Sequence, residues 1–320
     1  MGRAVTAFLA RRLTTSVVML FALSVVVFAA IEVLPGDAAI YAIAGQNPTA
    51  ELLEQTRHQL GLDRSAPERY FSWLLGILRG DFGQSALTGQ SVSGVVGDRV
   101  GNTVALGSLT ILFMIPLALA LGVFGGTREG RRADRTTSAL ILAVVAVPEF
   151  VLAAALTALF SFGLHWLPAT SLFPTEDSPL LHPEVLVLPV LTLVLFSASG
   201  ASRQVRAGVA DVMRSRYVEM ARLKGLPERR VVLRHVIPNS IAPSLQILAS
   251  SIGVVTGGSV IVETVFSYPG LGSALATAVT TRDFPLVEGV VMLLATTLLL
   301  AYTAADLAVL LLTPKLRTTS

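Results

Sequence analysis

The residues best suited to a function lie in one basic segment, residues 202–240, which contains nine of the chain's 24 Lys and Arg residues. The pattern predicts a helix that runs through about Lys224 and ends at Gly225, because glycine adopts a positive φ at little cost. Pro227 then fits the first turn of a second short helix. A tight turn between two amphipathic helices favours a docking surface for another protein. The alternative is a basic loop that only sets the orientation of the chain in a membrane.

One acidic residue, Glu149, falls near the middle of an apolar stretch. A charged side chain at the centre of a bilayer costs on the order of 2.5–3.5 kcal/mol, so we expect Glu149 to face the protein interior or a wet pathway. It follows Pro148, whose ring disrupts a helical hydrogen bond and favours a kink. Three roles remain open for its carboxyl group. It binds a cationic substrate group, it holds the kink through an interhelical hydrogen bond, or it is protonated and has no role.

Signatures of catalysis are missing from the sequence. The chain has no cysteine, its four histidines are dispersed, and neither lysine falls in the Gly-x-x-x-x-Gly-Lys-Ser/Thr pattern that cradles nucleotide phosphates. We therefore expect no enzyme activity, no metal site and no cofactor in this chain. If ATP drives the protein, separate subunits must bind the nucleotide and its Mg ion.

The elements that must position these residues are apolar helices. Hydrophobic residues make up 53% of the 320 residues and charged residues only 14%, and the mean hydropathy is +0.70. A bilayer core of about 30 Å needs about 20 apolar residues in a helix. The sequence thus predicts an all-α polytopic membrane protein with a single transmembrane domain over residues 1–320. The six predicted spans cover about residues 13–34, 103–124, 138–163, 185–201, 241–262 and 286–312.

Lys and Arg predict the orientation of these spans. With both termini in the cytosol, the inner segments hold 18 of the 24 basic residues; these segments are residues 1–12, 125–137, 202–240 and 313–320. The reverse orientation would place nine basic residues outside in one loop, against the positive-inside rule. We therefore interpret the net charge of +3 as a mark of the cytosolic membrane face, and we expect no nucleic-acid partner.

The outer segment between the first two spans, residues 35–102, is too long for a simple connection. Residues 50–60 and 67–78 have helical character, and several aromatic residues indicate that the segment packs on something. The sequence predicts a small folded cap on the extracytoplasmic side.

The basic segment resembles the EAA loop of ABC importer permeases. That pattern is Glu-Ala-Ala, three residues, Gly, nine residues, an aliphatic residue, one more residue, and an aliphatic residue followed by Pro. The residues that match in register are Glu219, Ala221, Gly225, Ile237 and Pro238, whereas Met220 and His235 depart from it. The Ala-Arg-x-Lys-Gly stretch, which includes Arg222 and Lys224, is similar to the dipeptide/oligopeptide/nickel subfamily. Similarity extends to Leu34-Pro35-Gly36-Asp37, to the Gly61–Ser85 stretch and to residues 263–272 and 282–285.

This resemblance implies the transmembrane subunit of an ABC importer in a bacterial inner or plasma membrane. It implies a heterodimer with a second homologous permease, two cytosolic ATPase subunits, and an extracytoplasmic substrate-binding protein. Di- or oligopeptides are the expected substrates, with nickel chelates or other small solutes as alternatives. An ion-coupled secondary transporter is a further alternative, disfavoured because Glu149 is the one acidic residue near mid-membrane.

The resemblance also implies roles for particular residues. The expected coupling residues, which would contact the ATPases, are Glu219, Ala221, Arg222, Lys224, Gly225 and Pro238. In the cap, Asp37, Asp81 and Ser85 are expected to contact the binding protein. Glu149 is the candidate residue of the translocation pathway.

Overall fold

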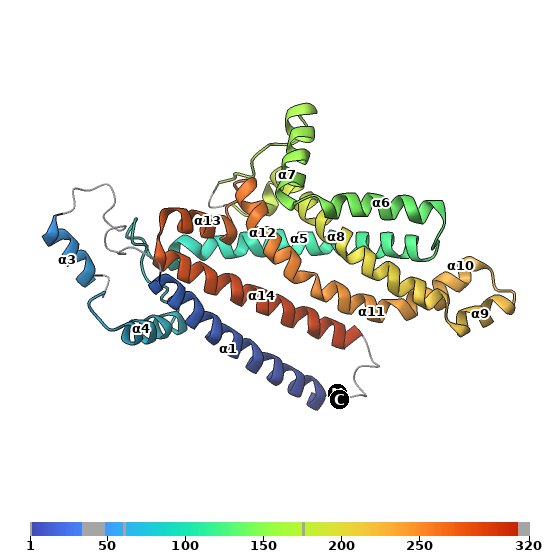
Figure 1. Cartoon of the computed structure of the whole chain (residues 1–320), viewed down its shortest axis with the longest axis horizontal. Coiled ribbons are helices and arrows are strands. Elements are labelled where there is room, and N and C mark those ends of the chain that lie inside the picture. The colour runs from blue at the N-terminus through green and yellow to red at the C-terminus, as the bar shows by residue number, and fades with distance from the viewer. Residues whose placement is uncertain (1, 34–48, 60–61, 175–176, 313–320) are drawn as a thin grey trace. The chain divides into compact units, whose positions relative to one another are not determined.

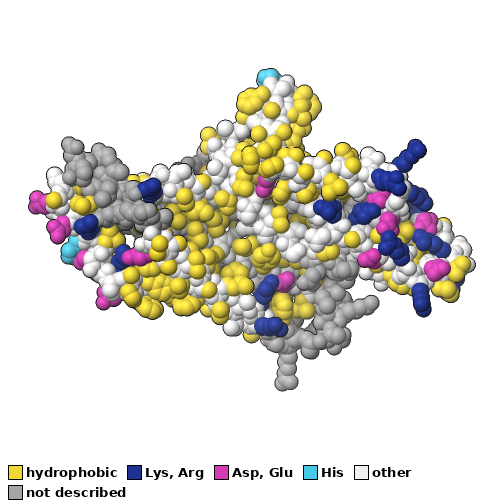
Figure 2. Space-filling model, viewed as in Figure 1, with side chains coloured by type: hydrophobic (Ala, Val, Ile, Leu, Met, Phe, Trp, Pro, Cys, Tyr) yellow, Lys and Arg dark blue, Asp and Glu magenta, His cyan; other side chains and the backbone are white. Residues whose placement is uncertain are grey.

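The computed structural model describes residues 2–33, 49–59, 62–174 and 177–312, and these residues form helices joined by turns (Figure 1). Five helices are long and apolar enough to cross a membrane, and one bent pair of helices is a candidate for a sixth span. The described residues form no β-sheet. This confirms the predicted all-α polytopic class. Hydrophobic side chains are widely exposed, as expected of helices that face lipid (Figure 2).

The chain divides into two compact units, and unit 1 comprises residues 1–104 and 269–299. Its helices are α1 (Gly2–Val33), α3 (Ala50–Gln59), α4 (Ala66–Leu78), the first part of α5 (Val92–Gly126), α13 (Leu271–Thr281) and most of α14 (Phe284–Leu312). Apolar residues at helical spacing on α5, α13 and α14 form its core, which contains Val92, Val96, Leu271, Ala274, Ala278, Leu286 and Val290.

The predicted helices of the outer segment are present as α3 and α4, and α4 packs on α1. The hydroxyl groups of Ser24 and Tyr70 lie 2.9 Å apart, and the ring of Phe28 lies 5.5 Å from that of Tyr70. Arg69 of α4 forms an ion pair with Glu32 near the end of α1. Polar and aromatic contacts therefore join this part of the predicted cap to the first helix.

Unit 2 comprises residues 105–268 and 300–320. In addition to the remaining parts of α5 and α14, it contains α6 (Arg132–Ala146), α7 (Glu149–Thr157) with a π-helical turn (Ala158–Gly163), a 3₁₀ turn (Pro179–Leu181), α8 (Pro183–Met213), α9 (Arg216–Leu223), α10 (Glu228–Val231) with a π-helical turn (Val232–Val236), α11 (Ile237–Ser250) and α12 (Ile252–Val265).

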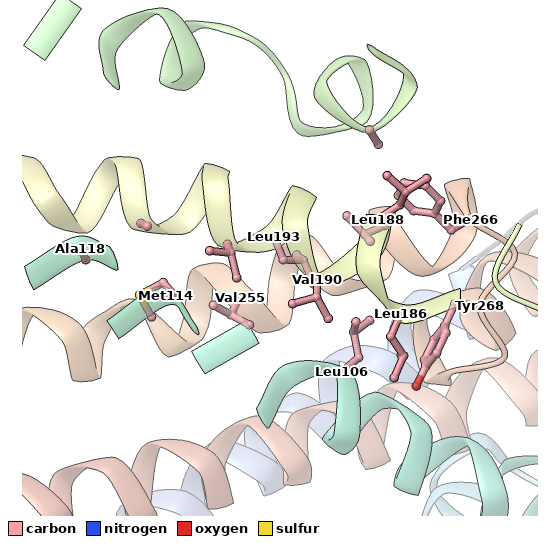
Figure 3. Close-up of a cluster of buried hydrophobic side chains, with 14 of the residues drawn as sticks. Leu106, Met114, Ala118, Leu186, Leu188, Val190, Leu193, Val255, Phe266 and Tyr268 are labelled. Carbon is pink, nitrogen blue, oxygen red and sulfur yellow. The ribbon is translucent and has the colours of Figure 1, made fainter. Parts of the chain in front are cut away.

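The helix α8 lies at the centre of unit 2 and contacts α6, α7, α11 and α12. Figure 3 shows Leu193 and Leu188 of α8 among buried side chains of the neighbouring helices, including Val255 of α12 and Leu106 of α5. Where α5 and α8 meet, a Cβ added to Gly126 would lie only 2.7 Å from a side-chain carbon of Val209. Small residues therefore allow these two helices to approach closely.

The third predicted span, residues 138–163, is not one straight helix. It is divided into α6 and α7, which are bent by 101° at the break between them. Val147, which precedes a proline, has an extended conformation, because the proline ring disfavours the α region there. Pro148 also has no N–H to continue the helical hydrogen bonds. The break is thus far sharper than the predicted kink.

Much of the predicted loop 202–240 is helical. The helix α8 extends through its first part to Met213, because Val205 and Val209 repeat at helical spacing and are fully buried. The fourth span is consequently longer than the predicted residues 185–201. The fifth, predicted at 241–262, comprises parts of α11 and α12, which meet at Ser251, and residues 247–265 are the stretch that is long and apolar enough to cross a membrane.

Candidate functional site

The turn predicted at Gly225 is confirmed. Gly225 has a φ of +75°, and its N–H donates to the carbonyl oxygen of Arg222 over 2.8 Å. The next N–H, of Leu226, donates to the carbonyl oxygen of Ala221 over 3.3 Å. These bonds cap the last carbonyl groups of α9, and Pro227 immediately precedes α10. The segment α9–turn–α10, residues 216–231, is here called the hairpin.

The inner face of the hairpin belongs to the core of unit 2. Val218 and Ala221 of α9 and Val231 of α10 are buried in one cluster with Val205 and Val209 of α8. A displacement of the hairpin therefore acts directly on α8, because close-packed side chains transmit displacement.

The outer face of the hairpin combines charge with exposed apolar side chains. Glu219, Lys224 and Gly225 are exposed. Tyr217, Met220 and Leu223 repeat every third residue and are also exposed, Leu223 at 75%. These three residues were not predicted as site residues, although their spacing indicates a second apolar face on α9. Two apolar faces on one short helix allow it to pack inward and to present a surface outward.

One predicted coupling residue, Arg222, has a role within the hairpin. Its guanidinium donates to both carboxylate oxygens of Glu228, over 2.7 and 3.1 Å. These hydrogen bonds hold the pKa of the Glu228 carboxyl below its ordinary value. The pair closes the turn around Gly225 from the outside. Pro238, the last predicted coupling residue, is exposed in the first turn of α11.

Glu149 is the first residue of α7, directly after the sharp bend. Its side chain is only 7% exposed, and no described residue forms a hydrogen bond with its Oε1 atom. It lies against the backbone of α12, where a Cβ added to Gly258 would lie 2.4 Å from Oε1. The residue thus faces the interior of unit 2, and it packs on a glycine.

The predicted cap residues differ in their surroundings. Asp37 lies outside the described residues. Asp81 is exposed in a turn, where its carboxylate accepts a hydrogen bond from the N–H of Gly83 over 2.9 Å. Ser85 is only 3% exposed, and its hydroxyl donates to the Asp283 carboxylate over 2.5 Å. Asp283 also accepts from the N–H of Ala86 over 3.1 Å, so it joins the cap to the connection between α13 and α14.

Two matches to a known family of transport proteins cover most of this chain. Residues 98–318 match the family described as "Binding-protein-dependent transport system inner membrane component", and residues 5–107 match its N-terminal membrane component. The two matches together cover nearly the whole chain. The chain belongs to this family, and it is a transmembrane permease component of a binding-protein-dependent transport system.

Relatives of similar length carry related names. A putative peptide transport system permease protein of Brucella abortus is 31% identical over 312 residues, which cover 98% of this chain and 99% of the relative. A similarly named protein of Brucella suis is 33% identical over 289 residues, 90% of this chain and 92% of the relative. The glutathione transport system permease protein GsiC of Escherichia coli is 30% identical over 310 residues, 97% of this chain and 98% of the relative.

Proposed function

We propose that this permease forms, with a second homologous permease, the membrane pathway of an ABC importer for di- or oligopeptides. Two cytosolic ATPase subunits, which bind ATP and Mg, drive it, and an extracytoplasmic protein delivers the substrate. Both chain termini lie in the cytosol. The names of the relatives support a peptide substrate, since peptide transport and glutathione transport are named among them.

The observation that supports coupling to an ATPase is the two-sided packing of the hairpin. Its inner valines belong to the same cluster as the valines of α8, and its outer face exposes Tyr217, Met220 and Leu223 beside charged residues. A subunit that docks on the outer face is thereby linked to a long transmembrane helix. Closure of the ATPases would act through this link and change the access of the pathway, as rigid elements do in alternating transitions.

Substitution of Gly225 tests this proposal. Valine at a φ of +75° is strained by at least ~1–2 kcal/mol, so Gly225→Val should distort the hairpin and lower ATP-driven peptide uptake about tenfold or more. Uptake and peptide-stimulated ATP hydrolysis are measured in vesicles that contain the assembled importer.

Gly130→Val is the matched control, because Gly130 has a φ of +77° and, like Gly225, has open space around it. It imposes the same strain in the turn between α5 and α6. The proposal requires that Gly225→Val uncouples hydrolysis from uptake while Gly130→Val retains coupling. Equal losses in both variants would mean that general backbone strain is responsible.

Competition tests the substrate class. Uptake of a labelled tripeptide by cells that express the importer should fall when excess unlabelled di- or tripeptide is added. A nickel chelate should not compete. If the chelate competes and the peptides do not, peptide import is the wrong assignment.

A further inference from the structure

A cavity of about 760 Å³ lies within unit 2, near the hairpin. The last turns of α5, the turn that follows it, α8, α10 and the start of α11 form its walls. Its size is within the range of small-molecule sites, which is about 300–1,000 Å³. It is separate from the exposed outer face of the hairpin, since none of Tyr217, Met220 and Leu223 lines it.

The lining of this cavity contains three arginines. Arg128, Arg131 and Arg229 line it, and no described carboxylate lies within ion-pair distance of any of the three. Glu228 is the one acidic lining residue, and it is bound by Arg222, which lies outside the lining. Figure 2 shows Lys and Arg side chains, with Asp and Glu side chains among them, at the end of unit 2 where α9 and α10 lie, so the excess of arginine is a property of the cavity lining itself. The cavity therefore has a surplus of positive charge and favours an anionic ligand.

One of these arginines is held in place. The Arg128 guanidinium lies 4.1 Å from the centroid of the Phe124 ring and donates to the Phe124 carbonyl oxygen over 3.3 Å. A guanidinium that stacks on an aromatic ring keeps donors free for a phosphate, so less freedom is lost when the anion binds.

The interior of the cavity is mainly apolar. Leu119, Val123 and Leu233 are among its lining residues. The two serines that line it, Ser240 and Ser244, each donate to a backbone carbonyl oxygen of α11, over 3.1 and 2.7 Å. Their donors are thus used within the helix. A free inorganic anion would leave these apolar walls without a partner, whereas an amphiphile would cover them.

The cavity lies where a transmembrane helix ends. The apolar helix α5 ends at Gly126, and Arg128 and Arg131 follow within five residues. Basic residues just beyond the end of a transmembrane helix are suited to contact lipid headgroups. Basic pockets between transmembrane helices are sites for anionic headgroups. We propose that this cavity binds an anionic phospholipid, with its phosphate on Arg128, Arg131 and Arg229 and its acyl chains along the apolar wall.

Lipid retention tests the proposal. The full-length chain is extracted with its partner subunits from membranes that contain phosphatidylglycerol and phosphatidylcholine, and the co-purified lipid is measured by mass spectrometry. The wild-type protein should retain phosphatidylglycerol in preference to phosphatidylcholine. Arg→Gln at Arg128, Arg131 and Arg229 should lower this preference about five-fold per residue and about 100-fold together. The triple Arg→Lys variant, which keeps the charge, should retain much of the preference and shows that the site still folds.

The control variant changes three exposed arginines of unit 2 that do not line the cavity, Arg132, Arg135 and Arg203. Their substitution by Gln should leave retention at the wild-type level. Equal losses in both triple variants would overturn the proposal, because the effect would then be one of net charge.

The identity of the occupant is tested by a photo-crosslinking residue at Leu233, which is exposed and lines the cavity. Crosslinks to phosphatidylglycerol are expected. Crosslinks to a partner subunit alone, or displacement of the lipid by millimolar inorganic phosphate, would overturn the lipid assignment in favour of a protein contact or a simple anion site.

Discussion

The carboxyl group of Glu149 occupies the space that a side chain at Gly258 of α12 would need. A Cβ at Gly258 would lie between 2.4 and 2.8 Å from three atoms of the carboxyl group. A larger residue at position 258 is therefore accommodated only if the side chain at position 149 moves or becomes smaller. The glycine at this position is required by packing, whereas its neighbour Gly257 has open space around it.

Gly258→Ala should destabilise the protein by about 1–3 kcal/mol, because the added methyl group overpacks a filled site. Thermal unfolding in detergent measures this loss. Gly257→Ala should be neutral or slightly stabilising. Adding Glu149→Ala to Gly258→Ala should recover part of the loss, because the two changes affect one contact. No recovery in the double variant would contradict this contact.

Glu149 itself is the candidate pathway residue, and its charge is tested by a change that keeps its shape. Glu149→Gln should leave assembly of the importer intact, because the amide has nearly the same shape as the carboxyl group. It should reduce uptake of peptides if the carboxylate binds their amino group. Uptake is compared for Glu149→Gln and Glu149→Leu at matched membrane levels. If Glu149→Gln retains normal uptake and Glu149→Leu assembles poorly, the residue has a packing role instead.

The helix α8 joins the parts of unit 2. Its first half lies in the main core of unit 2, and its last turns pack on the hairpin. Near that end, Arg206 of α8 donates to both carboxylate oxygens of Asp134 in the first turn of α6, over 2.6 and 2.7 Å. Asp134 also accepts from the N–H of Gly130 over 2.9 Å. A single buried carboxylate thus holds α6, its preceding turn and α8 together.

Asp134→Asn should destabilise the protein by about 1–3 kcal/mol. Loss of one partner of a buried pair costs about 3–5 kcal/mol, and part of this is recovered here because Arg206 is partly accessible to water. Asp211→Asn provides the comparison. Asp211 is exposed on α8, and its carboxylate lies 3.9 Å from the Arg214 guanidinium. The Asp211→Asn variant should lose less than about 1 kcal/mol of stability. If the unfolding temperature falls equally in the two variants, the buried pair contributes no more to stability than the exposed one.

The proposed orientation of the chain in the membrane places the cap outside and the hairpin inside. The chain has no native cysteine, so single introduced cysteines report on each side without interference. Because Ser85 is buried, Thr88 is the better cap position, and it is exposed in the same turn. Leu223 is the corresponding position on the outer face of the hairpin.

In intact cells, an impermeant thiol reagent should label Thr88→Cys and should not label Leu223→Cys. Opening the cytosolic side should then allow Leu223→Cys to react. The opposite pattern would reverse the orientation of the whole chain, and labelling of both in intact cells would show that the reagent had crossed the membrane.

Features that depend on neighbouring residues could be predicted from the amino-acid sequence alone. Long apolar runs are enough to predict membrane helices, because a helix satisfies its own backbone hydrogen bonds in lipid. Gly225 and Pro227 predict the hairpin for a similar local reason, since φ preferences belong to single residues. The family was also evident from the register of Glu219, Ala221 and Gly225.

Contacts between residues far apart in the chain could not be predicted in this way and are known from the three-dimensional structure. The sequence shows that Pro148 interrupts a helix, but the angle of 101° depends on the helices that pack around the break. It shows Ser85 and Asp283 as parts of two separate motifs, and nothing local indicates that one binds the other across 198 positions. The same holds for Glu149 against Gly258. Burial of polar and small side chains depends on how helices pack, and packing joins residues that the chain order keeps apart.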